Sequence, residues 1–217
     1  MTYRPKMNDK NDCYYFIDMI AALFNYTPEE ITKVIDDKKK YESPYLISFS
    51  KKKDDLHMWT CYGDNGRGIA LGFDKESLKN SASNFYHRYN IYAKLQECRY
   101  ENKRQIGKWL LATSISRESI LGYSGIVRSV SDVSNCIKHP CFKYEQEFRI
   151  VIEHGEKECC IGNCYNSSDT FNVQIPLAAI KKIIIGPCAN KNAIVKKFKS
   201  FFDKKTQFVE SNIPYRC

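Results

Sequence analysis

The chain has 217 residues, of which 43% are apolar and 13% aromatic, so it is long enough to bury a sizeable core. Lys and Arg total 34 against 25 acidic residues, and the resulting net charge of +9 would attract polyanions or a phosphate-bearing small ligand. No stretch approaches the roughly 18 apolar residues that a membrane span needs, and the N-terminus carries no basic-then-apolar secretion signal. We therefore expect a soluble, cytoplasmic protein without a membrane partner.

The first part of the chain predicts helices and one strand in alternation. Residues 13–24 are apolar enough for a buried helix. In residues 27–39, a threonine N-cap followed by proline and two acids predicts the start of a second helix. A strand is expected at residues 45–50, followed by a short helix within 54–63 that two aspartates cap and a glycine closes.

The middle of the chain changes from strand to helix. A glycine-rich turn at 64–68 leads into a short buried strand at 69–73, and residues 90–99 alternate well enough for another strand. From 101 to 137 the apolar spacing becomes helical, with one helix about Ile106, Leu110 and Leu111 and another about Ile126, Val130, Val133 and Ile137.

The last part of the chain returns to strands. They are expected at 143–152, 171–175, 181–185 and 208–209, with a helix near 190–203. A helical block inserted between strands favours an α+β fold with a mainly antiparallel, mixed sheet. No hinge-like segment interrupts the chain, so we expect a single domain spanning residues 1–217.

Ten cysteines raise the question of metal binding. The two clusters are Cys136-x2-His139-x-Cys141 and Cys159-Cys160-x3-Cys164, and neither contains a CxxC pair, the usual signature of a zinc site. A zinc site drawn from these clusters remains an alternative. We expect reduced, mostly buried thiols and no metal.

The segment Lys143–Ile152 introduces charges into an apolar strand. Because side chains alternate between the two faces of a strand, Glu145, Glu147 and Arg149 are expected on one face, opposite an apolar face. The strand at 45–50 has a similar polar row, formed by Ser48 and Ser50. Together the two strands would line a shallow polar cleft, where carboxylates are paired, solvated or used for chemistry.

Several segments, read together, resemble the DUF2971 family of bacterial proteins of unknown function. They are Ile47–Ser50 with Leu56–Gly66 and Gly68–Phe73, then Lys138–Phe142 with Glu145-x-Glu147-x-Arg149, and finally Ile183–Pro187 with Ser211–Arg216. The resemblance covers most of residues 45–216, and the combination of segments is more specific than any one of them.

The layout of that family is similar to the ADP-ribosyltransferases of the arginine, serine, glutamate type. The resemblance implies an ADP-ribosyltransferase-like fold and NAD as the co-substrate. It further implies that Glu147 is the catalytic acid, that Glu145 orients or activates the acceptor, and that Ser48 and Ser50 support the nicotinamide ribose. A toxin or an anti-phage effector is the expected biological role, with an acceptor that is a protein, a nucleic acid or a small molecule.

Further residues are candidates for holding NAD. Arg4 and Arg149 could contact the pyrophosphate, as arginines commonly do. Trp59 and Tyr62, three apart on the short helix, either stack on a ring or pack in the core. The segment Tyr3–Asp12 looks like the turn that follows the first strand in related members, so we expect the chain to begin after that strand.

Two structural interpretations stand beside the enzymatic one. Glu147 would be half of an ion pair with Arg149 or a lysine, and His57 and His139 would be structural histidines. A different class of function, a basic nucleic-acid-binding or accessory module without catalysis, would account for the net charge.

Overall fold

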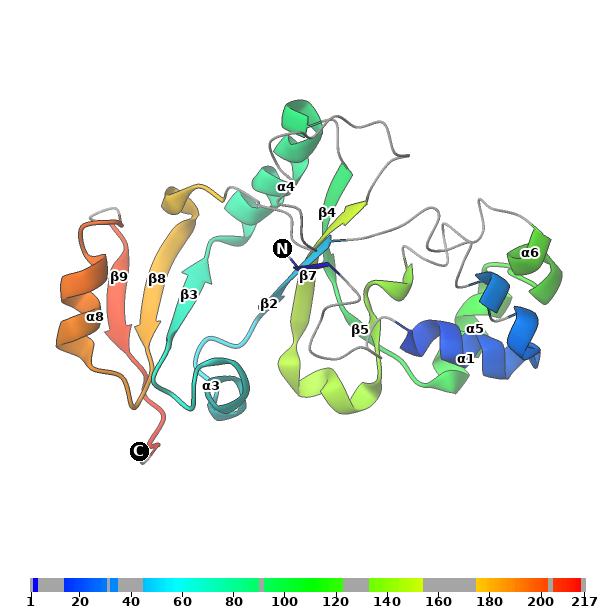
Figure 1. Ribbon diagram of the computed structural model, residues 1–217, viewed down its shortest axis with the longest axis horizontal. Coiled ribbons are helices and arrows are strands. Elements are labelled where there is room, and N and C mark those ends of the chain that lie inside the picture. Colours follow the sequence, from blue (N-terminus) through cyan, green and yellow to red (C-terminus); the bar gives the residue numbers. More distant parts are fainter. Residues whose placement is uncertain are drawn as a thin grey trace. The chain divides into compact units, whose positions relative to one another are not determined.

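The computed structural model describes residues 2–3, 14–30, 32–34, 45–89, 92–122, 133–153, 175–202 and 205–215. The fold is α+β, as expected, but the described strands form three small sheets in place of one (Figure 1). The chain divides into two compact units: the first contains residues 1–49 and 82–173, and the second contains 50–81 and 174–217. None of the helices in these ranges is long and apolar enough to cross a membrane.

The four-stranded sheet belongs to the first unit. Its order is β1 (Thr2–Tyr3), β2 (Tyr45–Ser50), β7 (Glu147–Glu153) and β4 (Tyr92–Glu97). β1 runs antiparallel to β2, and β4 runs antiparallel to β7. The serine strand and the glutamate strand, about 100 residues apart in sequence, are therefore direct neighbours.

Alternation of side chains along β2 and β7 matches the prediction. Phe49 stacks on Phe148, with ring centroids 5.4 Å apart, on one face of the sheet. Ser48 and Glu147 lie on the other face, because neighbouring residues of a strand point to opposite sides. On that second face, Leu46 and Val151 pack with Cys98 and Cys136 in a buried cluster. The half-buried Tyr100 packs against this cluster.

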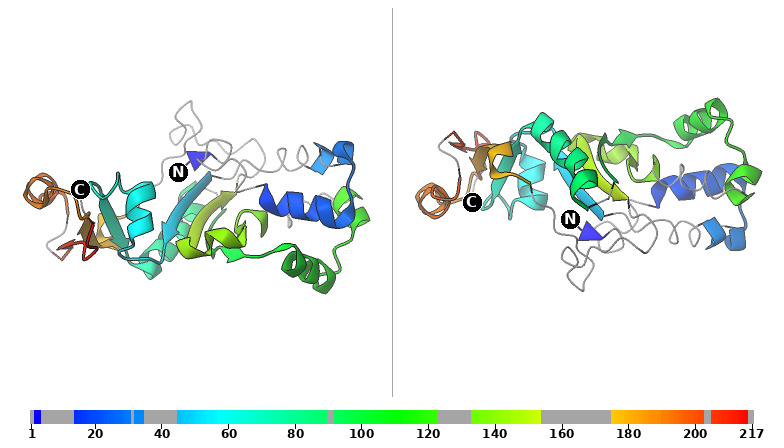
Figure 2. Two further views of the ribbon diagram at one scale, coloured as in Figure 1. Left: turned by 90° about the horizontal axis from the view of Figure 1, so that it is seen from below. Right: turned by 90° about the horizontal axis from the view of Figure 1, so that it is seen from above.

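Three helices of the first unit form a separate apolar core. They are α1 (Tyr15–Phe24), α5 (Lys103–Ala112) and α6 (Arg117–Gly122), which Figures 1 and 2 show gathered together. Val34, from the helical residues 32–34, and Ile137 of β6 also belong to this core, whose buried members are Phe16, Ile17, Ile20, Val34, Ile106, Leu110, Ile120 and Ile137. Leu111, expected on the apolar face of α5, is instead 82% exposed. The apolar stripe of this helix is therefore narrower than its sequence indicates.

The second helix begins where its sequence predicts. The Thr27 hydroxyl accepts a hydrogen bond from the Glu30 amide at 3.3 Å, and the Glu30 carboxylate accepts one from the Thr27 amide at 2.9 Å. This reciprocal pair satisfies two donors that the first turn of a helix leaves without partners. Residues 28–30 and 32–34 are helical.

The segment before β7 differs from the prediction. Ile137 was expected in a helix but lies in β6 (Ile137–Lys138), which pairs in parallel with β5 (Arg99–Tyr100). A 3-10 helix, η2 (Pro140–Glu145), follows, and β7 begins at Glu147. The predicted strand 143–152 is therefore too long at its N-terminal end, because His139 and Pro140 start a helical turn there.

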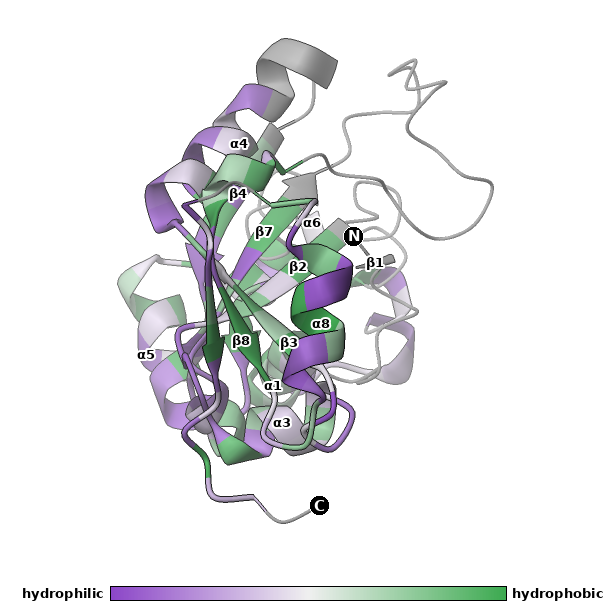
Figure 3. Cartoon of the chain, turned by 90° about the vertical axis from the view of Figure 1, so that its left-hand side faces the viewer, coloured by the Kyte–Doolittle hydropathy of each residue, from purple (hydrophilic) through white to green (hydrophobic). Residues whose placement is uncertain are grey.

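The second unit contains α3 (Leu56–Tyr62) and a three-stranded sheet. The strands are β3 (Ile69–Phe73), β8 (Ile180–Ile185) and β9 (Gln207–Glu210), accompanied by η3 (Leu177–Ala179) and α8 (Lys191–Phe198). The central strand β8 is strongly hydrophobic (Figure 3), with Ile183 and Ile185 almost fully buried. β3 is less buried than expected, since Leu71 is 40% exposed.

A helix that the apolar pattern did not predict, α4 (Lys75–Tyr89), follows β3. Its sequence is mostly polar, so periodicity gives little signal. Its start is fixed locally, because the Asp74 carboxylate accepts hydrogen bonds from the Ser77 amide at 2.9 Å and the Ser77 hydroxyl at 2.7 Å. α4 begins in the second unit and ends in the first.

The glycine-rich turn after α3 packs closely against the turn after β8. Asp64, Asn65 and Gly66 all have positive φ, which is the left-handed conformation that such residues tolerate best. The Gly186 amide donates to the Gly68 carbonyl at 3.0 Å, and the Cys188 amide donates to the Gly66 carbonyl at 2.9 Å. A Cβ on Gly186 would lie 2.2 Å from the Gly66 oxygen, so glycine is required at this contact.

Candidate functional site

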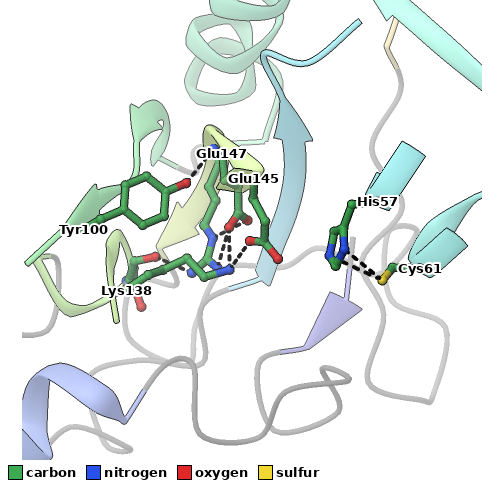
Figure 4. A network of polar contacts seen from close by, with 8 residues as sticks. His57, Cys61, Tyr100, Lys138, Glu145 and Glu147 are labelled. Carbon is green, nitrogen blue, oxygen red and sulfur yellow. Dashed lines mark hydrogen bonds and ion pairs between the residues drawn. The ribbon is translucent and has the colours of Figure 1, made fainter. Parts of the chain in front are cut away.

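Two lysine-bridged carboxylates form the centre of the candidate site (Figure 4). The Lys138 ammonium lies 2.6 Å from Oε2 of Glu145 and 2.9 Å from Oε2 of Glu147. All three side chains are about 7% exposed. The resemblance gave roles to the two glutamates but none to Lys138, the residue at the end of β6 that joins them.

Arg149 completes the cluster. Its Nε donates to Oε1 of Glu147 at 2.7 Å, its Nη2 donates to Oε2 at 3.1 Å, and its Nη1 donates to the Asn135 carbonyl at 2.7 Å. The side chain is 1% exposed. With two cations and two carboxylates, the four side chains have no net charge, which is how a protein keeps charges in its interior at tolerable cost.

Glu145 reaches this cluster from a helix and not from the strand. Gln146, with φ 45° and ψ 50°, ends η2 in a left-handed conformation and turns the chain into β7. The alternation argument therefore fails for Glu145, although the pairing of the two glutamates survives. The 3-10 helix itself is started by His139, whose Nδ1 accepts from the Cys141 amide at 3.2 Å, so His139 has the predicted structural role.

Tyr100 holds the backbone of Glu147. Its hydroxyl oxygen accepts a hydrogen bond from the Glu147 amide at 2.7 Å (Figure 4). Burial raises the pKa of Tyr100 to about 12, so this phenol stays neutral across the physiological range. On the other side, the Glu147 carbonyl accepts from the Cys98 amide at 2.9 Å. Glu147 is thus fixed through its main chain as well as its carboxylate.

The charge state of Glu147 follows from its partners. Burial alone raises the pKa of this carboxyl, but the hydrogen bond and charge of Arg149, the charge of Lys138 and a hydrogen bond from Ser48 outweigh it. The net effect lowers the pKa of Glu147 from 4.5 to about 2. Glu147 is therefore a carboxylate at neutral pH and is unsuited to donate a proton.

Ser48 is the exposed member of the network. Its side chain hydrogen-bonds to the Glu147 carboxylate from the neighbouring strand, while the residue itself is exposed. Ser50 lies at the end of β2, where its hydroxyl accepts from the Lys52 amide at 3.0 Å. The structure thus brings Ser48, Glu145, Glu147 and Arg149 into one network.

Other predicted site residues lie elsewhere. Trp59 is 4% exposed in the second unit, and its Nε1 donates to Oδ1 of Asp54 at 2.6 Å, so it packs in the core. Tyr62, also in that unit, is 62% exposed, and its proposed stacking on NAD stays a prediction. Arg4 lies outside the described residues.

Sequence reasoning missed a cysteine–histidine pair. His57 and Cys61 lie one turn apart on α3, with Nε2 of His57 3.4 Å from Sγ of Cys61 (Figure 4). The His-x3-Cys spacing on a predicted helix is the signal that would have found it. Cys188 is disulfide-bonded, which corrects the expectation of a reduced thiol at that position, whereas Cys61, Cys98, Cys136 and Cys141 are free, as expected. Spacing alone does not show which thiols a fold brings together.

A comparison with protein families gives one match. Residues 58–150 match the family described as "Protein of unknown function (DUF2971)". This match supports the DUF2971 resemblance. It begins within α3 and ends within β7, so it includes Lys138, Glu145, Glu147 and Arg149 but is shorter than the expected span of 45–216. Neither the curated proteins nor the solved structures include a match to the chain.

Proposed function

We propose that the chain is an ADP-ribosyltransferase-like enzyme that takes NAD as its donor, with Glu147 as the essential carboxylate. The observation that supports it best is the hydrogen bond between Ser48 and Glu147 across neighbouring strands. The family match over residues 58–150 supports the DUF2971 resemblance from which the proposal starts, and it includes Glu145 and Glu147 but not Ser48 or Ser50. Such an activity would suit a toxin or an anti-phage effector.

The chemistry needs a fixed negative charge. Breaking the bond between nicotinamide and ribose builds positive charge on the sugar, as in glycoside hydrolysis. A carboxylate held in place near that sugar stabilises the charge without having to reorganise during the reaction. Glu147 meets this requirement, since Arg149 and Lys138 keep its pKa near 2 and hold its side chain in one position.

Substrate would enter at Ser48. A carboxylate has about four lone-pair sites, and those of Glu147 accept from Arg149 twice, from Lys138 and from Ser48. The arginine and lysine are buried, whereas Ser48 is exposed. A ribose hydroxyl would therefore take the place of the Ser48 hydroxyl on the carboxylate and would itself be hydrogen-bonded by Ser48, with both ion pairs intact.

The remaining residues divide into two groups. Arg149, with its guanidinium bound to Glu147 and to the Asn135 carbonyl, acts as a positioning residue in this proposal and not as a pyrophosphate ligand. Glu145, which shares Lys138 with Glu147, would orient or activate the acceptor. Ser50 keeps its proposed role beside Ser48, whereas Trp59 is buried in the core of the second unit and has no place at the cofactor in this proposal. The acceptor would be a protein or a nucleic acid.

The test uses labelled NAD with candidate acceptors and three variants. Glu147→Gln should abolish label transfer, and Ser48→Ala should weaken NAD binding in calorimetry while leaving the buried ion pairs unchanged. Glu210→Gln is the matched control, because Glu210 is an exposed glutamate paired only on the surface with Lys191. Equal transfer by the wild-type protein and Glu147→Gln would remove Glu147 from the mechanism.

A second candidate, a basic nucleic-acid-binding or accessory module without catalysis, is favoured by a specific observation. Glu147 is buried in ion pairs with Lys138 and Arg149, as it would be in a purely structural role, and the net charge is +9. A salt-dependent mobility shift of RNA or DNA, with no heat of NAD binding, would favour this module over the enzyme.

A further inference from the structure

The exposed face of α3 carries a nucleophile next to a base. Sγ of Cys61 lies 3.4 Å from Nε2 and 4.0 Å from Nδ1 of His57, and both residues are exposed. A thiol and an imidazole within hydrogen-bond reach form the arrangement in which the base removes the thiol proton as the sulfur attacks. None of the proposed ADP-ribosyltransferase chemistry uses this pair.

The helix beneath this pair is held firmly. Asp55 caps its start by accepting from the Met58 amide at 3.2 Å, and Lys52 pairs with Asp55 at 3.0 Å. On the opposite side of the helix, the buried Trp59 is bonded to Asp54 at 2.6 Å. Because the backbone of α3 is fixed from both sides, His57 and Cys61 stay one turn apart and face solvent together.

We propose that Cys61 is a site of thiol modification that reacts with small disulfides, with His57 as its base. The Cys61 sulfur attacks one sulfur of the disulfide, and the bond between the two disulfide sulfurs breaks. A mixed disulfide forms on Cys61, and the other half leaves as a thiolate. His57 takes the thiol proton and passes it to that leaving thiolate, so the disulfide itself is the oxidant.

Other described thiols provide the contrast. Cys141 is also an exposed free cysteine, but its neighbour His139 uses Nδ1 to accept from the Cys141 amide at 3.2 Å and not to contact the sulfur. Cys98 and Cys136 are buried, and a hydrogen bond with Cys136 together with burial raises the pKa of Cys98. Among these four thiols, exposure and an adjacent imidazole coincide at Cys61.

Oxidised glutathione and peptide mass mapping test the inference on the full chain. The peptide containing Cys61 should gain the glutathione mass at least about fivefold faster than the peptide containing Cys141. His57→Gln should reduce the Cys61 rate to that of Cys141 and leave the Cys141 rate unchanged. Cys61→Ser should remove the fast-reacting site.

Either of two comparisons, between the cysteines of the wild-type protein or between wild type and His57→Gln, could overturn the assignment. In the first, the contradicting result is equal labelling of Cys61 and Cys141 in the wild-type protein. In the second, it is a His57→Gln protein whose Cys61 rate is unchanged, or in which both cysteines change together, since that would show that the histidine acts through folding and not on the sulfur. All of these measurements are independent of whether the protein uses NAD.

Discussion

Arg149 and Glu147 lie two residues apart on one face of β7 and are joined through their side chains, with Nε 2.7 Å from Oε1 and Nη2 3.1 Å from Oε2. In an extended strand, residues two apart lie on the same face, so their side chains can contact each other. The arginine is 1% exposed, so its guanidinium interacts with the Glu147 carboxylate and the Asn135 carbonyl and not with solvent. The pair fixes both the position and the ionisation of the carboxylate on which the proposed chemistry depends.

Removing the arginine should therefore be costly. Arg149→Met leaves Glu147 with one fewer cation in a buried site, and we expect a loss of about 3–5 kcal/mol in the free energy of unfolding. Urea denaturation of the wild-type protein and Arg149→Met measures this difference in unfolding free energy. Lys191→Met is the control, because its pair with Glu210 is more than half exposed and should contribute less than about 1 kcal/mol. Similar losses of unfolding free energy in the two variants would show that the buried ion pair stabilises the fold no more than the exposed one.

The depressed pKa of Glu147 predicts an acid-sensitive contribution to stability. The carboxyl titrates at about 2 in the folded chain, against 4.5 without partners, so the unfolded chain binds more protons between these values. The contribution, about 3 kcal/mol, is complete above pH 4.5 and is lost as the pH falls through 2.

Urea denaturation at several pH values checks this sign. Between pH 5 and 3 the wild-type free energy of unfolding should fall more steeply than that of Glu147→Gln, which has no carboxyl to titrate at this position. The comparison cancels the other acidic residues, which both proteins share. Parallel curves would contradict the low pKa.

A Gly186→Ala substitution should destabilise the second unit. The new methyl group would meet the Gly66 carbonyl oxygen at 2.2 Å, and because both groups belong to backbone turns, neither can rotate away. We expect a loss of about 2 kcal/mol or more. Gly122→Ala is the matched control, since nothing lies within 4 Å of its Cβ position. Thermal unfolding should show a lower Tm for the first variant only.

Asp54 connects α3 to the C-terminal segment. Its Oδ1 accepts from Trp59 Nε1 at 2.6 Å and from the Ser211 hydroxyl at 2.7 Å, and its Oδ2 accepts from the Asn212 amide at 2.7 Å. Asp54→Ala should cost about 2 kcal/mol or more, because it leaves three donors without their charged acceptor. Ser211→Ala, which removes one of the three, should cost about 1 kcal/mol in the same urea titration. An equal cost for both would contradict a shared role for the carboxylate.

Local signals in the sequence predicted several elements correctly. The bounds of β2 agree with the prediction, and α3 is capped by Asp55 and closed by Gly63 as expected. The paired phenylalanines Phe49 and Phe148 confirm the alternation on both strands. These features depend on neighbours in sequence, which is why pattern and capping rules identify them.

The expected ion pair of Glu147 with Arg149 or a lysine is confirmed, but neither the identity of the lysine nor its second contact with Glu145 was predicted. Lys138 lies seven residues from Glu145 and nine from Glu147, and only the left-handed turn at Gln146 brings all three together. The division of the strands into three sheets likewise depends on tertiary pairing that no single strand sequence encodes. The single-domain expectation for residues 1–217 and the missing first strand stay predictions.

Each of the two units is built from two separate stretches of the chain, which limits where the chain can be truncated. A fragment restricted to residues 58–150 would contain β3 without its partners β8 and β9, and most of β7 without its neighbour β2. Both edges of β3 and the edge of β7 that faces β2 would have no partner strand, although β4 and β7 would still pair. We therefore expect a fragment limited to residues 58–150 not to fold on its own and to associate through its unpaired strand edges.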